Sequence, residues 1–107
     1  MQPLTSAQRA YLRSLANRID AVFQIGKDGI GDTFIQQIDS ALEKRELIKI
    51  GLLETCEHTP KEAAQILCDA TDAQSVQIIG RKIVLYREAS EEENRHITLP
   101  QKSGKKA

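Results

Sequence analysis

The run Ala21-Val22-Phe23-Gln24-Ile25-Gly26-Lys27-Asp28-Gly29 decides the fold of this 107-residue chain. Its first five residues are mostly apolar and end at a glycine, which is the pattern of a short buried strand. Gly31 and Asp32 come next, and both residue types are tolerated at a helix N-terminus. The apolar residues that then recur at helical spacing are Phe34, Ile35, Ile38 and Leu42. The stretch therefore predicts a strand, a glycine turn and a helix in direct succession.

On the N-terminal side of this unit the sequence predicts a helix over about residues 6–17. Thr5 followed three residues later by Gln8 is a capping-box pattern. On the C-terminal side, residues 47–53 predict a second strand. The residues expected to share one face of that strand are Ile48, Ile50 and Leu52.

The stretch Thr59-Pro60-Lys61-Glu62 predicts the start of a third helix that runs to about Ala70. It combines an N-cap threonine, a proline at the first helical position and a second capping box. Residues 76–79 and 83–87 then predict two strands, with Gly80-Arg81 as a tight hairpin turn between them.

The expected order of elements is α-β-α-β-α-β-β, in which helices and strands largely alternate. This order favours an α/β fold, a single layered domain with a mixed sheet. We expect the domain to span residues 1–97 and a tail to span residues 98–107, with a disordered end.

The bulk composition excludes several classes of protein. The formal net charge is +0, and aromatic residues make up only 4%, too few for a binder that relies on stacked bases. Two cysteines give no disulfide framework, and we find neither a signal-peptide pattern nor a membrane-spanning run. We therefore expect a cytoplasmic protein without a membrane partner.

The charges are distributed unevenly along the chain. Acidic residues gather around positions 54–57, 69–72 and 88–93, away from most of the basic ones. The basic residues that could form one face are Arg9 and Arg13 on the first helix, Lys27 in the loop, Lys49 in the second strand, and Arg81, Lys82 and Arg87 on the hairpin. Such a face would attract phosphates, although solvated surface charge is the simpler alternative for any single residue.

The loop Gly26-Lys27-Asp28-Gly29 has two interpretations. Glycines allow close approach of a phosphate, and the helix that follows presents free N–H groups, as in KH domains that clamp nucleic-acid backbone. An ordinary turn is the alternative. Lys27 favours the first interpretation, whereas Asp28 and Asp32 weaken it by repelling phosphate.

The sequence offers no constellation of catalytic residues. Its histidines are His58 and His96, and Cys56, His58 and Cys68 fit no standard zinc spacing. We therefore expect no enzymatic activity, metal, cofactor or small-molecule substrate. Tyr86 is a candidate ring for base stacking, with strand packing as the alternative.

Several stretches together resemble the bacterial YhbY-like proteins, which are stand-alone CRM (chloroplast RNA splicing and ribosome maturation) domains. They are Leu4-Thr5 with Leu12-Arg13-Ser14-Leu15-Ala16, Ile25-Gly26-Lys27-Asp28-Gly29-Ile30, Glu46-Leu47-Ile48-Lys49-Ile50, Gly80-Arg81-Lys82-Ile83-Val84-Leu85-Tyr86-Arg87 and Ile97-Thr98-Leu99-Pro100. The resemblance implies a fold related to the C-terminal domain of translation initiation factor 3. It also implies RNA binding through the Gly-x-x-Gly loop and nearby basic residues, in precursors of the large ribosomal subunit.

The leading hypothesis is a monomeric, non-catalytic protein that binds ribosomal RNA during assembly of the large subunit. A protein-interaction adaptor without direct RNA contact is the alternative. The expected RNA-binding residues are Gly26, Lys27, Asp28, Gly29, Arg9, Arg13, Lys49, Arg81, Lys82 and Arg87.

Overall fold

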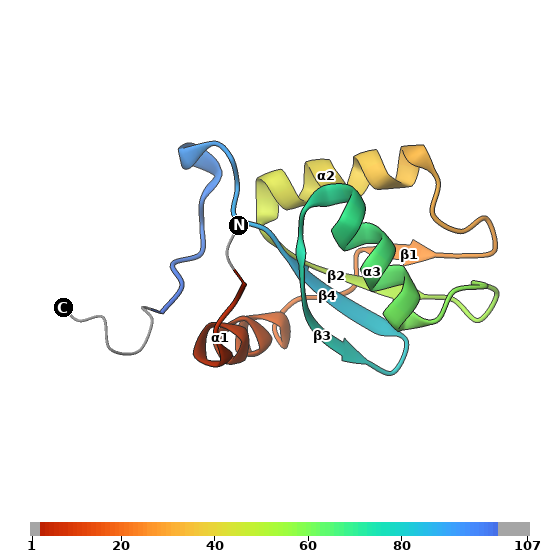
Figure 1. The fold of residues 1–107 in the computed structure, drawn as a ribbon, viewed down its shortest axis with the longest axis horizontal. Coiled ribbons are helices and arrows are strands. Elements are labelled where there is room, and N and C mark those ends of the chain that lie inside the picture. The colour runs from red at the N-terminus through yellow and green to blue at the C-terminus, as the bar shows by residue number, and fades with distance from the viewer. Residues whose placement is uncertain (1–2, 101–107) are drawn as a thin grey trace.

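The computed structural model describes residues 3–100 and has the expected order of helices and strands (Figure 1). The elements are α1 (Ser6–Ala16), β1 (Phe23–Ile25), α2 (Asp32–Arg45), β2 (Leu47–Leu52), α3 (Pro60–Thr71), β3 (Gln74–Ile79), β4 (Lys82–Tyr86) and a 3₁₀ turn, η1 (Glu92–Asn94). The α/β class is confirmed. The expectation of a disordered end lies outside the described residues.

The four strands form one mixed sheet in the order β1-β2-β4-β3. β1 runs parallel to β2, while β4 runs antiparallel to both β2 and β3. The hairpin between β3 and β4 turns at Gly80, whose φ of +55° is a conformation that glycine adopts without strain.

The two faces of the sheet are covered unequally. α2 and α3 pack on one face, where the alternating residues Ile48, Ile50 and Leu85 are buried (Figure 1). α1 packs on the other face, where its Leu12 and Ala16 belong to the same buried cluster as the sheet residues Leu47, Val76, Val84 and Tyr86. α1 therefore covers one end of its face and leaves the other end open.

Local capping decides where α1 and α3 begin. Thr5 Oγ1 accepts from Gln8 N at 3.1 Å, and the Gln8 side chain accepts from Thr5 N at 3.0 Å. Thr59 and Glu62 repeat this reciprocal pair at the start of α3. Both predicted capping boxes are confirmed, and each satisfies donors that a helix end otherwise leaves unpaired.

The first strand is shorter than the sequence suggests, covering Phe23–Ile25 rather than residues 21–25. Val22 N still donates to Lys49 O at 3.3 Å, but the ladder with β2 begins only at Phe23. The preceding residues approach from α1 on one face of the sheet, so they reach β2 only at this point.

A buried glutamate organises the segment after β4, and nothing in the sequence pattern pointed to it. Glu46 joins α2 to β2, is fully buried and has a φ of +66°. Its carboxylate accepts backbone hydrogen bonds from Ala89 at 2.8 Å, His96 at 2.7 Å and Ile97 at 3.0 Å. These three bonds fold the chain after β4 back over the C-terminal end of α2.

Glu43, one turn earlier on α2, holds the same segment. Its carboxylate accepts from Ser90 N at 2.9 Å, Ser90 Oγ at 2.8 Å and Glu91 N at 3.0 Å. The backbone N–H groups of Ser90 and Glu91 lower the pKa of Glu43 from 4.5 to about 2. These hydrogen bonds favour the charged carboxylate.

The lowered pKa of Glu43 predicts a pH dependence of stability. A folded-state pKa below the unfolded one contributes stability above about pH 4.5, and this stability is lost as the pH falls toward 2. Urea unfolding at pH 5, 4, 3 and 2 should show that the free energy of unfolding of wild type exceeds that of Glu43→Gln at pH 5 and that this difference disappears toward pH 2. A constant difference between the two proteins at all four pH values would contradict the prediction. Glu92→Gln, at an exposed carboxylate, is the matched control.

Candidate nucleic-acid interface

The Gly26–Gly29 loop is a closed turn at the end of β1. Gly29 N donates to Gly26 O at 3.0 Å, and Gly29 has a φ of +73°, which a residue with a Cβ adopts only with strain. Lys27 and Asp28 are exposed at the tip of the turn. The turn thus presents a lysine and backbone at the molecular surface directly before α2.

The start of α2 adds polar backbone groups beside the loop. Gly31 caps the helix without a side-chain hydrogen bond, and Ile35 N is the first amide to donate within the helix, to Gly31 O at 3.0 Å. The N–H groups of the first turn therefore point outward, where they favour an anion. Asp32 lies in the same turn and opposes this effect in part.

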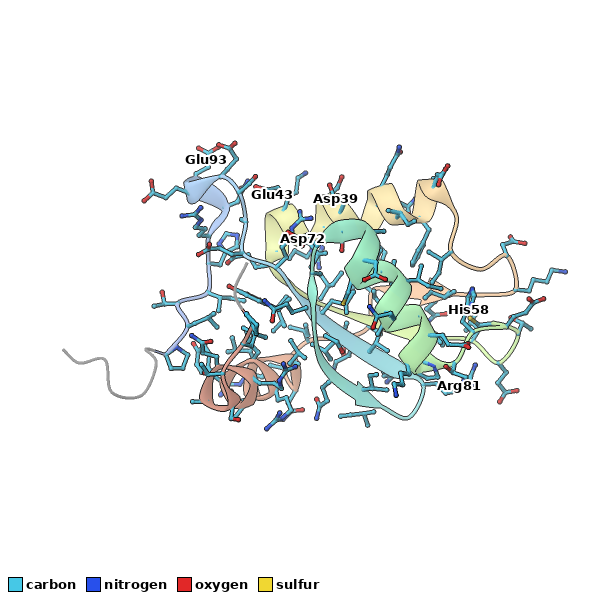
Figure 2. All side chains as sticks on the ribbon, viewed as in Figure 1. Asp39, Glu43, His58, Asp72, Arg81 and Glu93 are labelled. Atoms are coloured by element: carbon cyan, nitrogen blue, oxygen red, sulfur yellow. The ribbon has the colours of Figure 1, made fainter. Side chains whose placement is uncertain are left out.

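The segment of residues 53–58 supports the loop from behind. A Cβ on Gly26 would lie 3.5 Å from Leu53 Cδ1, and one on Gly29 would lie 4.0 Å from His58 Nε2. Arg81 in turn holds this segment, because its guanidinium donates to Leu52 O at 3.1 Å and to Leu53 O at 2.6 Å. Figure 2 shows Arg81 and His58 at the same end of the molecule. Arg81 is therefore a support for the loop as well as a cation at its base.

The open end of the sheet lies next to this loop. The strand register places Gln24, Gly51, Lys82 and Ile79 in one row across β1, β2, β4 and β3. Because Gly51 has no side chain, the row contains a hollow of about 360 Å³, with Arg81 and Lys82 in its lining. Lys49 lies in the next row, closer to α1, so the surface carries cations from the loop to the helix.

Two further expected cations lie on α1. Arg9 donates through Nη1 to the carbonyl of Ser75 in β3, which ties this side chain to the sheet. Arg13 is half-buried in the last turn of the helix. Both lie on the helix that borders the open end of the sheet.

Arg87 is not brought together with the other cations. Its Nη1 donates to Asp39 Oδ1 at 2.6 Å and to Thr71 O at 2.8 Å, and its Nη2 lies 3.8 Å from Glu43 Oε1. Figure 2 shows Asp39 and Glu43 on the opposite side of the molecule from Arg81. Arg87 thus links α2 to α3 and is neutralised by acidic neighbours.

The surface offers few rings for base stacking. Tyr86 is 1% exposed, and burial raises the pKa of its hydroxyl to about 12. The stacking role considered for Tyr86 is therefore wrong, because the ring packs under α1. Phe23 and Phe34 contact each other edge to face on the side of the sheet that α2 and α3 cover, with ring centroids 6.4 Å apart. Tyr11, at 37% exposure on α1, is the remaining phenylalanine or tyrosine of this chain.

The described residues hold no group of three or more metal-ligating side chains. Burial, with a smaller effect of Asp69, raises the pKa of the Cys68 thiol to about 11, so this cysteine is protonated at neutral pH. Within residues 3–100, no helix is both long enough and apolar enough to cross a bilayer.

The fold and the loop define a class of small α/β domains with a Gly-x-x-Gly turn between a parallel strand and a helix. The CRS1/YhbY (CRM) domain model matches residues 4–87. The chain therefore belongs to the CRS1/YhbY (CRM) domain family, and the resemblance seen in the sequence is confirmed.

Individual relatives cover nearly the whole chain. YqeI of Bacillus subtilis, named a probable RNA-binding protein, is 45% identical over 91% of this chain and 99% of its own length. A Haemophilus influenzae protein named RNA-binding protein is 31% identical over 95% of this chain and 100% of its own. The solution structure of SAV1595 from Staphylococcus aureus matches with a TM-score of 0.73 and 49% identity, covering 92% of this chain and 100% of that one.

Proposed function

We propose that this chain is a non-catalytic RNA-binding protein whose interface joins the Gly26–Gly29 loop to the open end of the sheet. The observation that carries the proposal is the continuity of this surface. Lys27 lies in the loop, Lys82 in β4 and Lys49 in β2, and no ion pair to any of them is present within residues 3–100. Membership of a family whose relatives bear RNA-binding names supports the same assignment.

The proposed mode of binding is contact with backbone and shape. Cations and backbone N–H groups contact phosphates, which positions RNA without identifying bases. The scarcity of exposed rings fits this mode better than binding on an aromatic platform. Within RNA, we propose structured ribosomal RNA of large-subunit precursors as the target and the cytoplasm as the location, as the family resemblance implies.

A binding titration at two salt concentrations tests the proposal. Structured ribosomal RNA should bind wild type with an affinity that falls steeply between 50 and 200 mM salt, since each phosphate contact releases counterions. Lys82→Glu should weaken binding about tenfold, as expected for the loss of one charge-assisted contact. Gln65→Glu/Ala70→Glu adds negative charge to exposed positions of α3 and should bind like wild type. Equal binding by Lys82→Glu and wild type would remove the open sheet from the interface.

A protein-interaction adaptor is the second candidate, and exposed apolar residues favour it. Ile78 and Ile79, at the end of the edge strand β3, are 42% and 55% exposed. Contacts made through such side chains depend little on salt. A salt-independent interaction with a protein, together with no measurable RNA binding, would support the adaptor and contradict the RNA-binding proposal.

A further inference from the structure

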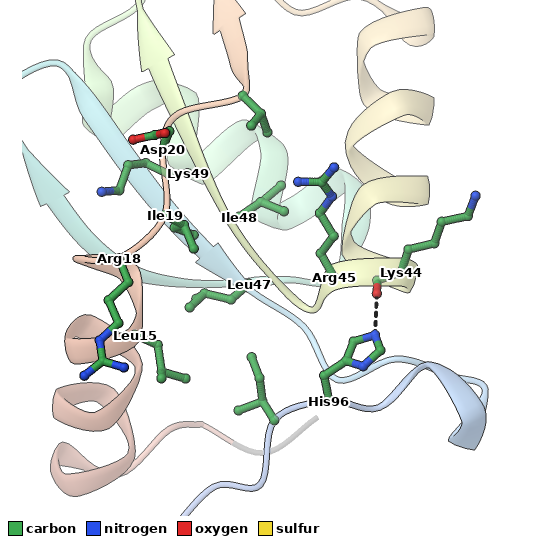
Figure 3. A pocket seen from close by; sticks show the side chains of 12 residues that line it. Leu15, Arg18, Ile19, Asp20, Lys44, Arg45, Leu47, Ile48, Lys49 and His96 are labelled. Atoms are coloured by element: carbon green, nitrogen blue, oxygen red, sulfur yellow. Dashed lines mark hydrogen bonds between the residues drawn. The ribbon is translucent and has the colours of Figure 1, made fainter.

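A second hollow lies on the other side of Lys49, away from the glycine loop. It has a volume of about 670 Å³ and lies between the C-terminal end of α1, the start of β2 and the segment after η1 (Figure 3). Its apolar lining includes Leu15, Ile19, Val22, Leu47 and Ile97. Pockets of about 300–1,000 Å³ with apolar walls are typical of sites for small organic groups.

The rim of this hollow is positively charged. Arg18 comes from the turn after α1, Arg45 comes from the end of α2, and Lys49 comes from β2. Lys44 lines the hollow near its backbone, where its carbonyl oxygen lies 2.9 Å from His96 Nε2, and its side chain points away (Figure 3). Among residues 3–100, Asp20 is the one carboxylate that lines it. The sequence alone explained Lys44 and Arg45 as charges that suit a helix C-terminus. In the fold, Arg45 also lines an apolar hollow together with Arg18 and Lys49, a combination that suits a group with a flat apolar body and an attached anion.

The floor of the hollow is an unpaired piece of strand edge. Arg87 N donates to Glu46 O and Leu52 N donates to Arg81 O, so the even-numbered residues of β2 bond to β4. The odd-numbered residues therefore direct their backbone groups toward β1, which pairs only with Ile50–Leu52. Among the described residues, the N–H and C=O of Leu47 have no hydrogen-bond partner on this side.

The length of this open edge decides what could occupy it. On the N-terminal side of Leu47 the strand ends, because Glu46 connects it to α2. On the C-terminal side, Lys49 O already accepts a hydrogen bond from Val22 N. An added peptide strand needs several consecutive open positions, and this edge offers about one. A single planar group with its own donors and acceptors fits that edge, between aliphatic walls.

We propose that this hollow holds one unpaired nucleobase of the bound RNA, with the adjoining phosphates on the cations of the rim. The proposal rests on the proposed RNA-binding function and adds a substrate class, RNA with an unstacked nucleotide. The faces of the base pack against Leu15, Ile19 and Ile97, and its edge meets the free N–H and C=O of Leu47. Apolar walls and a few fixed polar groups are how proteins read an extruded base.

The test compares two RNA hairpins of the same sequence that differ by one unpaired nucleotide. Wild type should bind the bulged hairpin about tenfold more tightly than the paired one. Val22→Trp places an indole in the hollow, and since Val22 is 52% exposed the core is not disturbed. This variant should lose the preference while keeping its affinity for the paired hairpin. Ala70→Trp, at an exposed position of α3, is the control and should keep the preference.

Methyl NMR of wild type locates the base independently of any variant. The bulged hairpin should shift the methyl signals of Leu15, Ile19 and Val22, and the paired hairpin should leave them in place. Equal affinity for both hairpins would overturn the base pocket but not the RNA-binding function. Loss of binding to both hairpins in Val22→Trp would also overturn the pocket, because the effect would not be specific to a base. Wild type that binds neither hairpin would overturn both proposals.

An NMR titration with a peptide distinguishes RNA from protein as the occupant of the hollow. An acidic, leucine-containing peptide should leave the methyl signals of Leu15, Ile19 and Val22 unchanged at concentrations where the bulged hairpin shifts them. If the peptide shifts these signals and the hairpin does not, the hollow is a protein site and the proposal is wrong.

Discussion

Glu46→Ala is expected to lower the free energy of unfolding by about 3 to 5 kcal/mol. The substitution removes a fully buried carboxylate and leaves the amides of Ala89, His96 and Ile97 without their acceptor. A buried donor without a partner costs roughly 1 to 3 kcal/mol, and water that enters the site recovers part of this cost. Domains of this size are stable by only about 5 to 15 kcal/mol, so the variant should be close to unfolding. Urea denaturation measures the effect directly.

Glu46→Gln keeps the shape of the side chain but replaces one carboxylate oxygen with an amide that donates hydrogen bonds. Oε1 of Glu46 accepts from His96 and Ile97, whereas Oε2 accepts from Ala89. A glutamine can keep its oxygen on the first pair, but its amide then faces the N–H of Ala89 donor to donor. We expect a loss of about 1 to 3 kcal/mol and faster hydrogen exchange at Ala89 than at Ile97. Glu92→Ala, at an exposed glutamate, is the control, and an equal stability of Glu46→Ala and this control would refute the account.

The triple variant Lys27→Glu/Lys49→Glu/Lys82→Glu is expected to bind structured RNA about 1,000-fold more weakly than wild type. Each lysine is assigned one phosphate contact, and the loss of a charge-assisted contact is worth at least about 1.4 kcal/mol, or tenfold. The slope of log affinity against log salt should also fall by roughly 2 to 3. Titrations at four salt concentrations give both quantities from one data set.

The structure predicts that this variant folds. Lys27 and Lys82 are exposed, Lys49 is half-buried, and none of the three forms an ion pair within residues 3–100. Its unfolding free energy should therefore stay close to that of wild type, which makes the binding loss interpretable. Normal folding with undiminished RNA affinity would show that the surface from the loop to α1 is not the interface.

Much of the fold could be predicted because the deciding interactions are short in sequence. The capping boxes at Thr5 and Thr59 each involve residues three positions apart, and the turn at Gly80 depends on one backbone conformation. The alternation of Ile48, Ile50 and Leu52 correctly identified the face of β2 that α2 and α3 cover. Such signals can be recognised in the sequence because each one involves only a few neighbouring residues.

The candidate site was only partly predictable. The glycine loop could be found from its own residues, and Lys27 is exposed at its tip as expected. Arg81 and Arg87 looked alike in the sequence, six residues apart on one hairpin. In the fold, Arg81 supports the loop through Leu52 O and Leu53 O, whereas Arg87 pairs with Asp39. Their partners lie roughly 30 to 50 positions away, which no local pattern encodes.

The sequence by itself determined the elements, their order, the glycine turn and the family. Tertiary structure alone decided the strand order β1-β2-β4-β3, the half of the sheet that α1 leaves open, the buried role of Glu46 and the grouping of Arg18, Arg45 and Lys49 around one hollow. The physical reason is the range of the forces involved. Caps, turns and hydrophobic periodicity act within a few residues. Which charged groups end up as neighbours depends on how whole elements pack, and hence on contacts between distant parts of the chain.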